Sequence, residues 1–224
     1  MQAMILAAGR GERLRPLTDS CPKPLVKVAS KPLIFWHLLK LKSIGINDIV
    51  VNSAHLSSMI VDTLGDGKKF GLKITHSVEL PPGLETAGGI INALPYLIDD
   101  YFLVINGDVF IDGPYEQFLN PPTGDALARM FMVKNPQHHL QGDFSLKKGQ
   151  IILGNNLTFS GVAVYKREAF EGFKVDRLPL KPFFLRWIEG NKAQGQLLDG
   201  AWFDVGTLER LKQTEEYIRS KESL

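Results

Sequence analysis

The feature that most constrains this chain is an apolar segment that runs directly into a glycine-rich, basic segment near the N-terminus. Residues 4–8 read Met-Ile-Leu-Ala-Ala, which is typical of a buried strand, and residues 9–23 contain two glycines, three arginines and a lysine. Glycines let the backbone approach a ligand closely, and loop N–H groups beside basic side chains suit a polyphosphate. The segment therefore predicts a strand that leads into a phosphate-binding loop.

The spacing within this loop excludes two common phosphate motifs. The Gly-Lys-Ser/Thr ending of a Walker loop is absent, and Leu14 stands where a dinucleotide fingerprint needs its third glycine. Gly9 and Gly11 alone would fit equally well a tight turn with solvated arginines. The further basic residues on the same segment favour the phosphate-binding interpretation.

Apolar runs and helical patterns alternate through the first half of the chain. The predicted strands cover 3–8, 48–52, 72–77 and 101–106, and the helices between them cover 32–45, 56–64 and 86–94. This alternation predicts an α/β fold, a Rossmann-like, mostly parallel sheet flanked by helices. Because ligands of such sheets bind outside the carboxyl ends of the strands, we expect the first loop and Asp108 to meet there.

The pattern changes after about residue 124. Short strands are predicted at 127–133, 143–146, 150–153, 159–164, 194–198 and 201–204, with helices at 180–189 and 207–220. Thr207 is a plausible N-cap of the last helix. No linker or repeat separates the two halves, so we expect a single domain over residues 1–224 with a small β-rich sub-region.

Composition excludes several classes of protein. The chain has 224 residues, 44% of them hydrophobic, and a net charge of only +2, so nucleic acid is not expected as its main partner. Its single cysteine, Cys21, cannot form an intrachain disulfide. Because no run approaches about 18 apolar residues, we expect no membrane span and no secretion, and the expected location is the cytoplasm.

The basic loop resembles the signature of the sugar-1-phosphate nucleotidyltransferases. The matching residues are Leu6-Ala7-Ala8-Gly9-x-Gly11-x-Arg13-x-Arg15-Pro16-Leu17-Thr18 and Pro22-Lys23-Pro24-Leu25. The resemblance implies that the substrates are a nucleoside triphosphate and a sugar 1-phosphate, that Mg²⁺ is the cofactor and that pyrophosphate is released. It also implies a nucleotide-binding half of about 1–124 and a sugar-binding and lid half of about 125–224.

The same resemblance implies roles for individual residues. Arg15 and Lys23 are expected to be catalytic, by neutralising phosphate charge. The nucleotide-binding set is expected to be Leu6, Ala7, Ala8, Gly9, Gly11, Glu12, Arg13, Lys23, Glu85, Thr86 and Gly88. Asp108 and Asp204 are the expected metal ligands, because Mg²⁺ prefers carboxylate oxygens. The alternative for each aspartate is a turn or a helix cap.

For the sugar, the candidates are Asn106, Asp143 and Ser160. Asp143 would fit a solvated turn equally well before the resemblance is counted. His138 and His139 invite a metal interpretation, but adjacent residues of a strand point to opposite faces, so we expect no metal there.

Further motifs resemble one branch of the family, the N-acetylmuramic acid 1-phosphate uridylyltransferases. They are Leu84-Glu85-Thr86-x-Gly88-Gly89, Gly142-Asp143-Phe144, Thr158-Phe159-Ser160-Gly161 and Trp202-x-Asp204-Val205-Gly206-Thr207. Ala87 departs from the glycine of that branch. The branch implies UTP as the donor, UDP-N-acetylmuramic acid as the product and a place in peptidoglycan recycling. A cation should face the lactyl carboxylate, and the candidates are Lys134, Lys147, Lys181 and Arg186.

Other functions stay open at this point. They are a uridylyl- or thymidylyltransferase acting on glucose 1-phosphate, a cytidylyltransferase acting on phosphocholine, and a catalytically silent subunit that senses nucleotide sugars. A phosphocholine enzyme would need an aromatic cage for the quaternary ammonium. Trp36, Trp187 and Trp202 are scattered along the chain, and the sequence neither assembles such a cage nor excludes it. A silent subunit should have lost Arg15, Lys23 or one of the aspartates, and all are present. The oligomeric state is not predicted.

Overall fold

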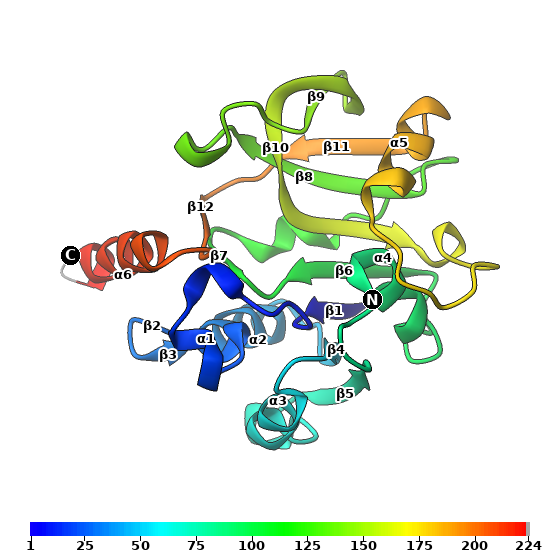
Figure 1. Cartoon of the computed structure of the whole chain (residues 1–224). Coiled ribbons are helices and arrows are strands. Elements are labelled where there is room, and N and C mark those ends of the chain that lie inside the picture. The colour runs from blue at the N-terminus through cyan, green and yellow to red at the C-terminus, as the bar shows by residue number, and fades with distance from the viewer. Residues whose placement is uncertain (223–224) are drawn as a thin grey trace.

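The computed structural model describes residues 1–222 and arranges them around a mixed β-sheet with helices on both faces (Figure 1). The strands of this sheet are β1 Gln2–Leu6, β4 Asp48–Ser53, β5 Lys73–Val78, β6 Tyr101–Asn106, β8 Ala128–Lys134, β9 Phe144–Lys147, β10 Gln150–Lys166 and β11 Ala193–Leu197. Their order is β11-β8-β10-β6-β1-β4-β5, and β9 pairs with β10.

The predicted fold class is confirmed. β1 pairs in parallel with β4 and with β6, and β4 pairs in parallel with β5, which gives the Rossmann-like half. β10 runs antiparallel to both β6 and β8, so it joins this half to the strands of the second half of the chain. The carboxyl ends of β1, β4, β5 and β6 therefore lie along one edge.

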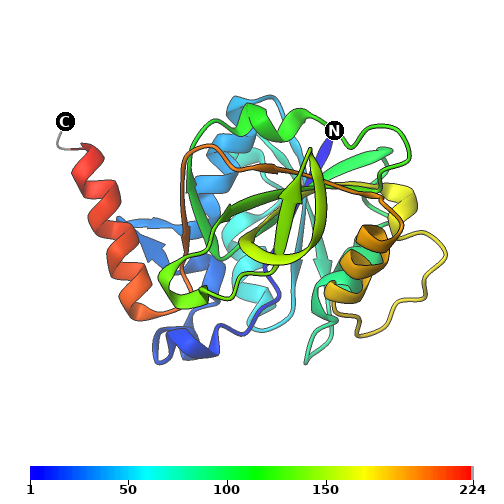
Figure 2. The same ribbon diagram turned by 90° about the horizontal axis from the view of Figure 1, so that it is seen from above.

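Successive residues of the central strands belong to opposite faces of the sheet, as the strand period of two requires. Met4 packs into the core beneath α4 (Glu85–Ala93) and α5 (Lys181–Glu189), whereas Ala3 and Ile5 pack beneath α2 (Leu33–Ser43) and α3 (Ser57–Leu64). Figure 2 shows these two helical layers on opposite sides of the sheet. The central strands β1, β4 and β6 are buried on both faces, as expected for parallel strands, whereas the edge strand β5 is partly exposed.

A smaller layer lies beside the main sheet. β7 (Val109–Asp112) pairs antiparallel with β12 (Ala201–Asp204), and β2 (Lys27–Val28) pairs with β3 (Lys31–Pro32). α6 (Leu208–Glu222) packs on these strands through Ile218, in a cluster with Phe110 and Val205. β7 was not predicted, because its four residues follow the turn after β6 too closely to stand out as a separate run.

The prediction of two separate strands at 150–153 and 159–164 is wrong. Both belong to β10, which pairs in turn with β9, β8 and β6. The register shifts between Ile152 and Leu157 and again between Phe159 and Ala163. Gly161, with φ of +80°, lies in the second shift. The turn residues of this stretch therefore bend one strand instead of ending it.

Helix starts follow the sequence signals closely. Pro32 precedes α2, and the Thr207 hydroxyl accepts the N–H of Arg210 at 3.3 Å at the start of α6, which confirms the predicted N-cap. The segment after the first loop holds a short helix that was expected to be loop, α1 (Leu17–Ser20). Among residues 1–222, none of the helices has the length and hydropathy needed to cross a bilayer.

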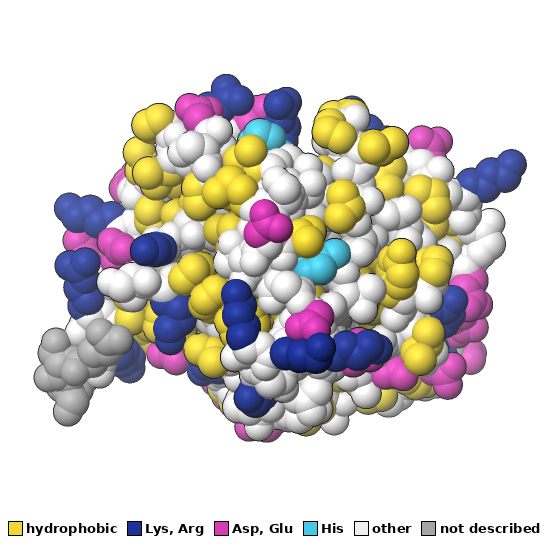
Figure 3. Space-filling model, turned by 90° about the horizontal axis from the view of Figure 1, so that it is seen from below, with side chains coloured by type: hydrophobic (Ala, Val, Ile, Leu, Met, Phe, Trp, Pro, Cys, Tyr) yellow, Lys and Arg dark blue, Asp and Glu magenta, His cyan; other side chains and the backbone are white. Residues whose placement is uncertain are grey.

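Surface charge is mixed on the face shown in Figure 3, where lysines and arginines are interspersed with aspartates and glutamates. This face therefore carries no continuous basic surface of the kind that binds nucleic acid.

Candidate active site

A cleft of about 760 Å³ opens at the carboxyl ends of β1, β4, β5 and β6. One wall is the first loop, and the opposite wall is the segment that leads into α4. The lining residues are Leu6, Ala7, Ala8, Gly9, Arg10, Gly11, Glu12, Arg13, Lys23, Pro24, Asn52, Glu79, Pro82, Gly83, Leu84, Glu85, Thr86, Asn106, Gly107, Asp108, Arg177 and Gly206. The expected nucleotide-binding residues are thus brought together, with the exception of Gly88.

The first loop folds back on the segment that follows it. Gly11 has φ of +66°, and a Cβ there would lie 2.9 Å from Thr18 Cγ2, so only glycine fits. The Thr18 hydroxyl donates to the Gly11 carbonyl at 2.8 Å. Around Gly9 the space is open, since a Cβ there would meet nothing within 4 Å. The backbone at Gly9 is therefore accessible to a ligand in the cleft.

Lys23 crosses from the loop to the end of β6. It begins the short 3-10 helix η2 (Lys23–Leu25), and its Nζ lies 2.6 Å from Asp108 Oδ2. The Lys23 side chain is only 8% exposed, whereas that of Asp108 is 37% exposed. A nearly buried ammonium needs an anionic partner, and Asp108 supplies it. The expected meeting of the loop with Asp108 is confirmed.

Asp204 reaches the same edge through the pairing of β7 with β12. Asp204 is in register with Val109, and the N–H of Val205 donates to the Asp108 carbonyl at 2.9 Å. Asp108, in the turn just before β7, and Asp204, at the end of β12, therefore stand beside each other at the same end of this small sheet, although only Asp108 lines the cleft.

The carboxylate of Asp204 is held from α6 and from the 3-10 helix η5 (Gln137–His139). Arg210 Nη1 donates to Asp204 Oδ2 at 2.9 Å, and His138 Nε2 lies 3.5 Å from the same oxygen. A Cβ on Gly206 would collide with the Arg210 guanidinium, so glycine is needed for this contact. Burial, followed by the nearby Arg210 charge, lowers the pKa of His138.

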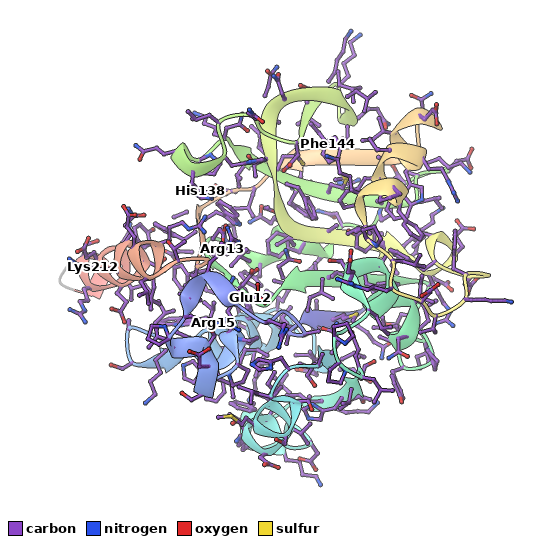
Figure 4. All side chains as sticks on the ribbon, viewed as in Figure 1. Glu12, Arg13, Arg15, His138, Phe144 and Lys212 are labelled. Carbon is purple, nitrogen blue, oxygen red and sulfur yellow. The ribbon has the colours of Figure 1, made fainter. Side chains whose placement is uncertain are left out.

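Arg15 does not line the cleft. Its Nε lies 3.1 Å from Asp19 Oδ1, and both side chains are more than half exposed. Arg13 does line the cleft and is close enough to His138 to lower its pKa. Figure 4 shows Arg13 and His138 in the same region, where the first loop passes beneath η5. The catalytic role of Arg15 stays a prediction.

The wall at the start of α4 is formed by Glu85 and Thr86. Glu85 has φ of +58°, and its Oε1 lies 3.2 Å from Arg177 Nε. Gly88 faces away into packing, because its N–H donates to the Leu178 carbonyl at 3.1 Å and a Cβ there would collide with the Asp176 carbonyl. Packing thus requires glycine at position 88, and its role in nucleotide binding stays a prediction.

The candidate sugar residues lie around one segment of β10, because a Cβ on Gly161 would lie 2.6 Å from Asn106 Nδ2 and Asp143 bonds to Phe159, but only one of the three lines the cleft. Asn106 lines the cleft, whereas the Ser160 side chain is fully buried and its Oγ accepts the N–H of Val162 at 3.2 Å. Asp143 lies outside the lining, with Oδ2 accepting the N–H of Phe159 at 2.8 Å and Oδ1 lying 3.1 Å from His139. The structure does not place Asp143 and Ser160 on the cleft, and their roles stay predictions.

A comparison with models of protein families matches residues 2–141 to one described as Nucleotidyl transferase. The chain belongs to the nucleotidyl transferase family. The matched region contains Lys23 and Asp108, whereas Asp204 and Arg210 lie beyond it.

Curated relatives of this nucleotidyl transferase agree with the family. The chain is 47% identical to an N-acetylmuramate alpha-1-phosphate uridylyltransferase of Neisseria meningitidis serogroup B, over 96% of this chain and 97% of that protein. It is 32% identical to a probable mannose-1-phosphate guanylyltransferase of Oryza sativa subsp. japonica, over 97% of this chain but only 63% of that protein. The resemblance drawn from the motifs, including its narrower branch, is confirmed.

Solved structures support the fold. A putative glucose-1-phosphate thymidylyltransferase from Bacillus anthracis, in complex with sucrose, superimposes with a TM-score of 0.85 over 98% of this chain and 95% of that chain. Since the two sequences are 23% identical, this likeness concerns the fold alone.

Three residues that line the nucleotidyl transferase cleft were missed from the sequence, namely Asn52, Glu79 and Arg177. Arg210, which holds Asp204 without lining the cleft, was missed as well. Asn52 and Glu79 stand at the carboxyl ends of β4 and β5, and the rule that singled out Asp108 at the end of β6 would have found them. Arg177 carries no such signal, because it reaches the cleft from a segment far along the chain. Arg210 follows the expected metal ligand Asp204 by only six residues, at the start of α6, so its position in the sequence was an available signal.

The donor chemistry of the site fits a hard divalent cation. Mg²⁺ commonly takes one or two protein carboxylates and completes its shell with phosphate oxygens and water. Asp108, just before β7, and Asp204, at the end of the adjacent β12, can supply that number. Within residues 1–222, no group of three or more His, Cys, Asp or Glu side chains is gathered for a metal, so phosphates or water would have to supply the remaining ligands.

Proposed function

We propose that this chain joins UTP and N-acetylmuramic acid 1-phosphate to give UDP-N-acetylmuramic acid and pyrophosphate, in the peptidoglycan recycling of the cytoplasm. The 47% identity to the Neisseria uridylyltransferase, over nearly the whole of both chains, supports the choice of substrates. The observation that carries the reaction class is the contact of Lys23 with Asp108 at the floor of the cleft.

In the proposed reaction, a phosphate oxygen of the sugar 1-phosphate attacks the α-phosphorus of UTP. The bond from that phosphorus to the bridging oxygen breaks, and pyrophosphate leaves with its electron pair. Because both reactants are anions, the protein must neutralise charge and hold them in line. Lys23 meets the first need, since its ammonium is held in one position by Asp108 and by burial.

The two walls of the cleft suit the two ends of the nucleotide. The accessible backbone at Gly9 and the guanidinium of Arg13 would face the triphosphate. Glu85 and Thr86, on the opposite wall, would face the base. Arg15 would reach the triphosphate only by leaving Asp19, an exchange that costs little because both side chains are exposed.

Asp108 and Asp204 would hold Mg²⁺. When bound, the ion would neutralise negative charge on the substrate phosphates. Arg210 orients the Asp204 carboxylate through its hydrogen bond of 2.9 Å, and Lys23 orients Asp108. Asn106 is the sugar-side candidate that already lines the cleft. Asp143 would accept hydrogen bonds from sugar O–H or N–H groups if the sugar extends toward η5. The Ser160 hydroxyl is buried, so Ser160 would contribute by shaping the backbone of β10 and not by touching the sugar.

Nothing in the cleft favours phosphocholine. Trp36, Trp187 and Trp202 are absent from its lining, and they pack in three different clusters of the described chain. An aromatic cage for a quaternary ammonium is therefore not built from them.

The test is a matrix of UTP, dTTP, CTP and GTP against N-acetylmuramic acid 1-phosphate, glucose 1-phosphate and phosphocholine, with pyrophosphate release as the readout. We expect the highest kcat/KM for UTP with the muramic acid derivative. If glucose 1-phosphate serves as well or better, the choice of sugar is wrong and the reaction class survives. If no pair releases pyrophosphate, the chain is the silent subunit.

A further inference from the structure

Two buried polar side chains, Asn52 and Glu79, lie in the floor of the cleft and take no part in the chemistry proposed above. Their side chains line the cleft, and the two residues are only 2% and 3% exposed. Burying a carboxylate is costly unless its oxygens are satisfied, and no salt bridge to Glu79 occurs in the described part of the chain. Such a pair calls for an explanation beyond packing.

The two side chains form a continuous line of hydrogen bonds from one wall of the cleft to the other. The Ala7 N–H donates to Asn52 Oδ1 at 2.8 Å, and Asn52 Nδ2 donates to Glu79 Oε1 at 2.6 Å. Glu79 Oε2 then accepts the Leu84 N–H at 2.8 Å. Ala7 belongs to the first loop and Leu84 to the wall that leads into α4.

The two ends of this line restrict which pair of side chains can complete it. Both ends are backbone N–H groups, which can only donate. One of the two side chains must therefore accept twice, and the other must accept once and donate once. An amide followed by a carboxylate meets these requirements, and the side chains of Asn52 and Glu79 supply them in that order.

The glycine at position 89 makes room for the line. A Cβ on Gly89 would lie 2.7 Å from Glu79 Oε1 and 2.8 Å from Asn52 Nδ2. The wall at Leu84 is also hydrogen-bonded to the segment before α5, because the Leu84 carbonyl accepts the N–H of Leu178 at 3.0 Å. The line thus joins the first loop to a wall that the bond between Leu84 and Leu178 holds in place.

We propose that Asn52 and Glu79 are positioning residues that set the spacing of the two cleft walls and thereby the affinity for the nucleoside triphosphate. This inference rests on the proposed function, since it takes the cleft to be the nucleotide site. The pair acts through the backbone at Ala7 and Leu84, so its loss should weaken nucleotide binding more than it alters the chemical step.

The directional requirement supplies a test by exchange. In Glu79→Gln the new amide has one acceptor for two donors, so one N–H group is left facing an NH₂ group. In Asn52→Asp two carboxylates face each other across a hydrogen-bond distance. In the double variant the new carboxylate at position 52 accepts from Ala7 and from the new amide, whose carbonyl accepts from Leu84. Only the double variant restores the line.

We would measure the Kd for UTP by calorimetry with Mg²⁺ and without sugar, together with kcat and KM. Each single variant should bind UTP about tenfold more weakly or worse, because a buried donor or acceptor is left unpaired. The double variant should return to within about threefold of the wild type.

The matched control is Gln2→Leu. Gln2 is a buried amide at the opposite end of β1, where it bonds to the Tyr96 carbonyl and to the Ile98 N–H. This variant should lose thermal stability and keep its Kd for UTP.

Single variants that bind UTP like the wild type would overturn the proposal, and so would a folded double variant no better than the weaker single one. If a single variant does not fold, a folded double variant with near wild-type affinity still supports the proposal. If the wild type turns over UTP but the double variant still binds UTP weakly, the positioning role is wrong and the proposed function survives. A wild type that binds no nucleotide defeats the proposed function as well.

Discussion

The Lys23 ammonium lies 2.6 Å from the Asp108 carboxylate, although 85 residues separate them in the chain. The contact joins the first loop to the end of β6, and the Lys23 side chain is nearly buried while Asp108 is open to the cleft. A charge held in this way needs no reorganisation when phosphates arrive, which is the condition for strong electrostatic stabilisation.

Replacement of Asp108 by asparagine should abolish most Mg²⁺-dependent turnover while the chain stays folded. The variant loses a proposed metal ligand and leaves Lys23 beside a neutral amide, so we expect kcat to fall about 100-fold or more. Asp204→Asn should behave likewise. Pyrophosphate release at several Mg²⁺ concentrations measures the effect, with circular dichroism to check folding.

The control for both variants is Asp48→Asn. Asp48 is also paired with a lysine, Lys73, but it stands at the amino end of β4, away from the cleft. Its loss should leave turnover intact. Near-normal turnover of Asp108→Asn or Asp204→Asn with unchanged Mg²⁺ dependence would remove that residue from the proposed metal site.

Lys23→Ala should lower kcat more than it raises KM, because charge between the two phosphates builds up in the transition state. Lys23→Arg should restore little of the loss, since a planar guanidinium does not fit the position of a buried ammonium. Steady-state kinetics with both substrates measures the split. An unaltered kcat in Lys23→Ala would show that the lysine serves only to balance Asp108.

Arg15 can be tested against its own ion-pair partner. Arg15→Ala and Asp19→Ala each break the same exposed pair, which should cost the fold less than about 1 kcal/mol. If Arg15 contacts the triphosphate, only Arg15→Ala should lower kcat. Equal kinetics in the two variants would confine Arg15 to the surface pair.

Gly89→Ala should weaken nucleotide binding although alanine is the better helix former by about 1 kcal/mol. The new methyl would lie 2.7 Å from Glu79 Oε1, and that oxygen cannot swing away without breaking its bond to Asn52. We expect a higher Kd for UTP, measured by calorimetry. Gly190→Ala is the control, because its Cβ would come no closer than 3.4 Å to any neighbour.

Stability should fall as the solution is acidified, in part because of His37. This residue is fully buried beside Tyr115, and burial lowers its pKa from 6.5 to about 4. Between these values the unfolded chain binds a proton that the folded chain does not, so unfolding becomes easier as pH falls through the window. The shift corresponds to roughly 3 kcal/mol, lost between pH 6.5 and 4.

Urea unfolding at pH 7, 5 and 4 measures this loss. His37→Gln removes the titrating group, so its stability should depend on pH more weakly than that of the wild type. His55→Gln controls for the loss of a histidine that is not fully buried. Parallel pH curves for the wild type and His37→Gln would contradict the assignment.

Much of the fold was predictable because its signals are local. The run from Tyr101 to Asn106 was placed to the residue, and α2 and α6 begin beside Pro32 and Thr207 as their sequence signals indicate. β10 could not be predicted as one strand. Its continuity depends on four different pairing partners, β6, β8, β9 and β11, and the bend at Gly161 has the sequence of a turn.

The sequence by itself determined the family, the α/β class and the residue types on the first loop, because motif spacing and hydrophobic period act over short stretches of chain. Only the tertiary structure decided which of those residues meet. It paired Lys23 with Asp108, turned Arg15 toward Asp19 and closed the line from Asn52 to Glu79. Such contacts depend on strand order and on register between distant segments, and neither is written in the pattern of any one segment.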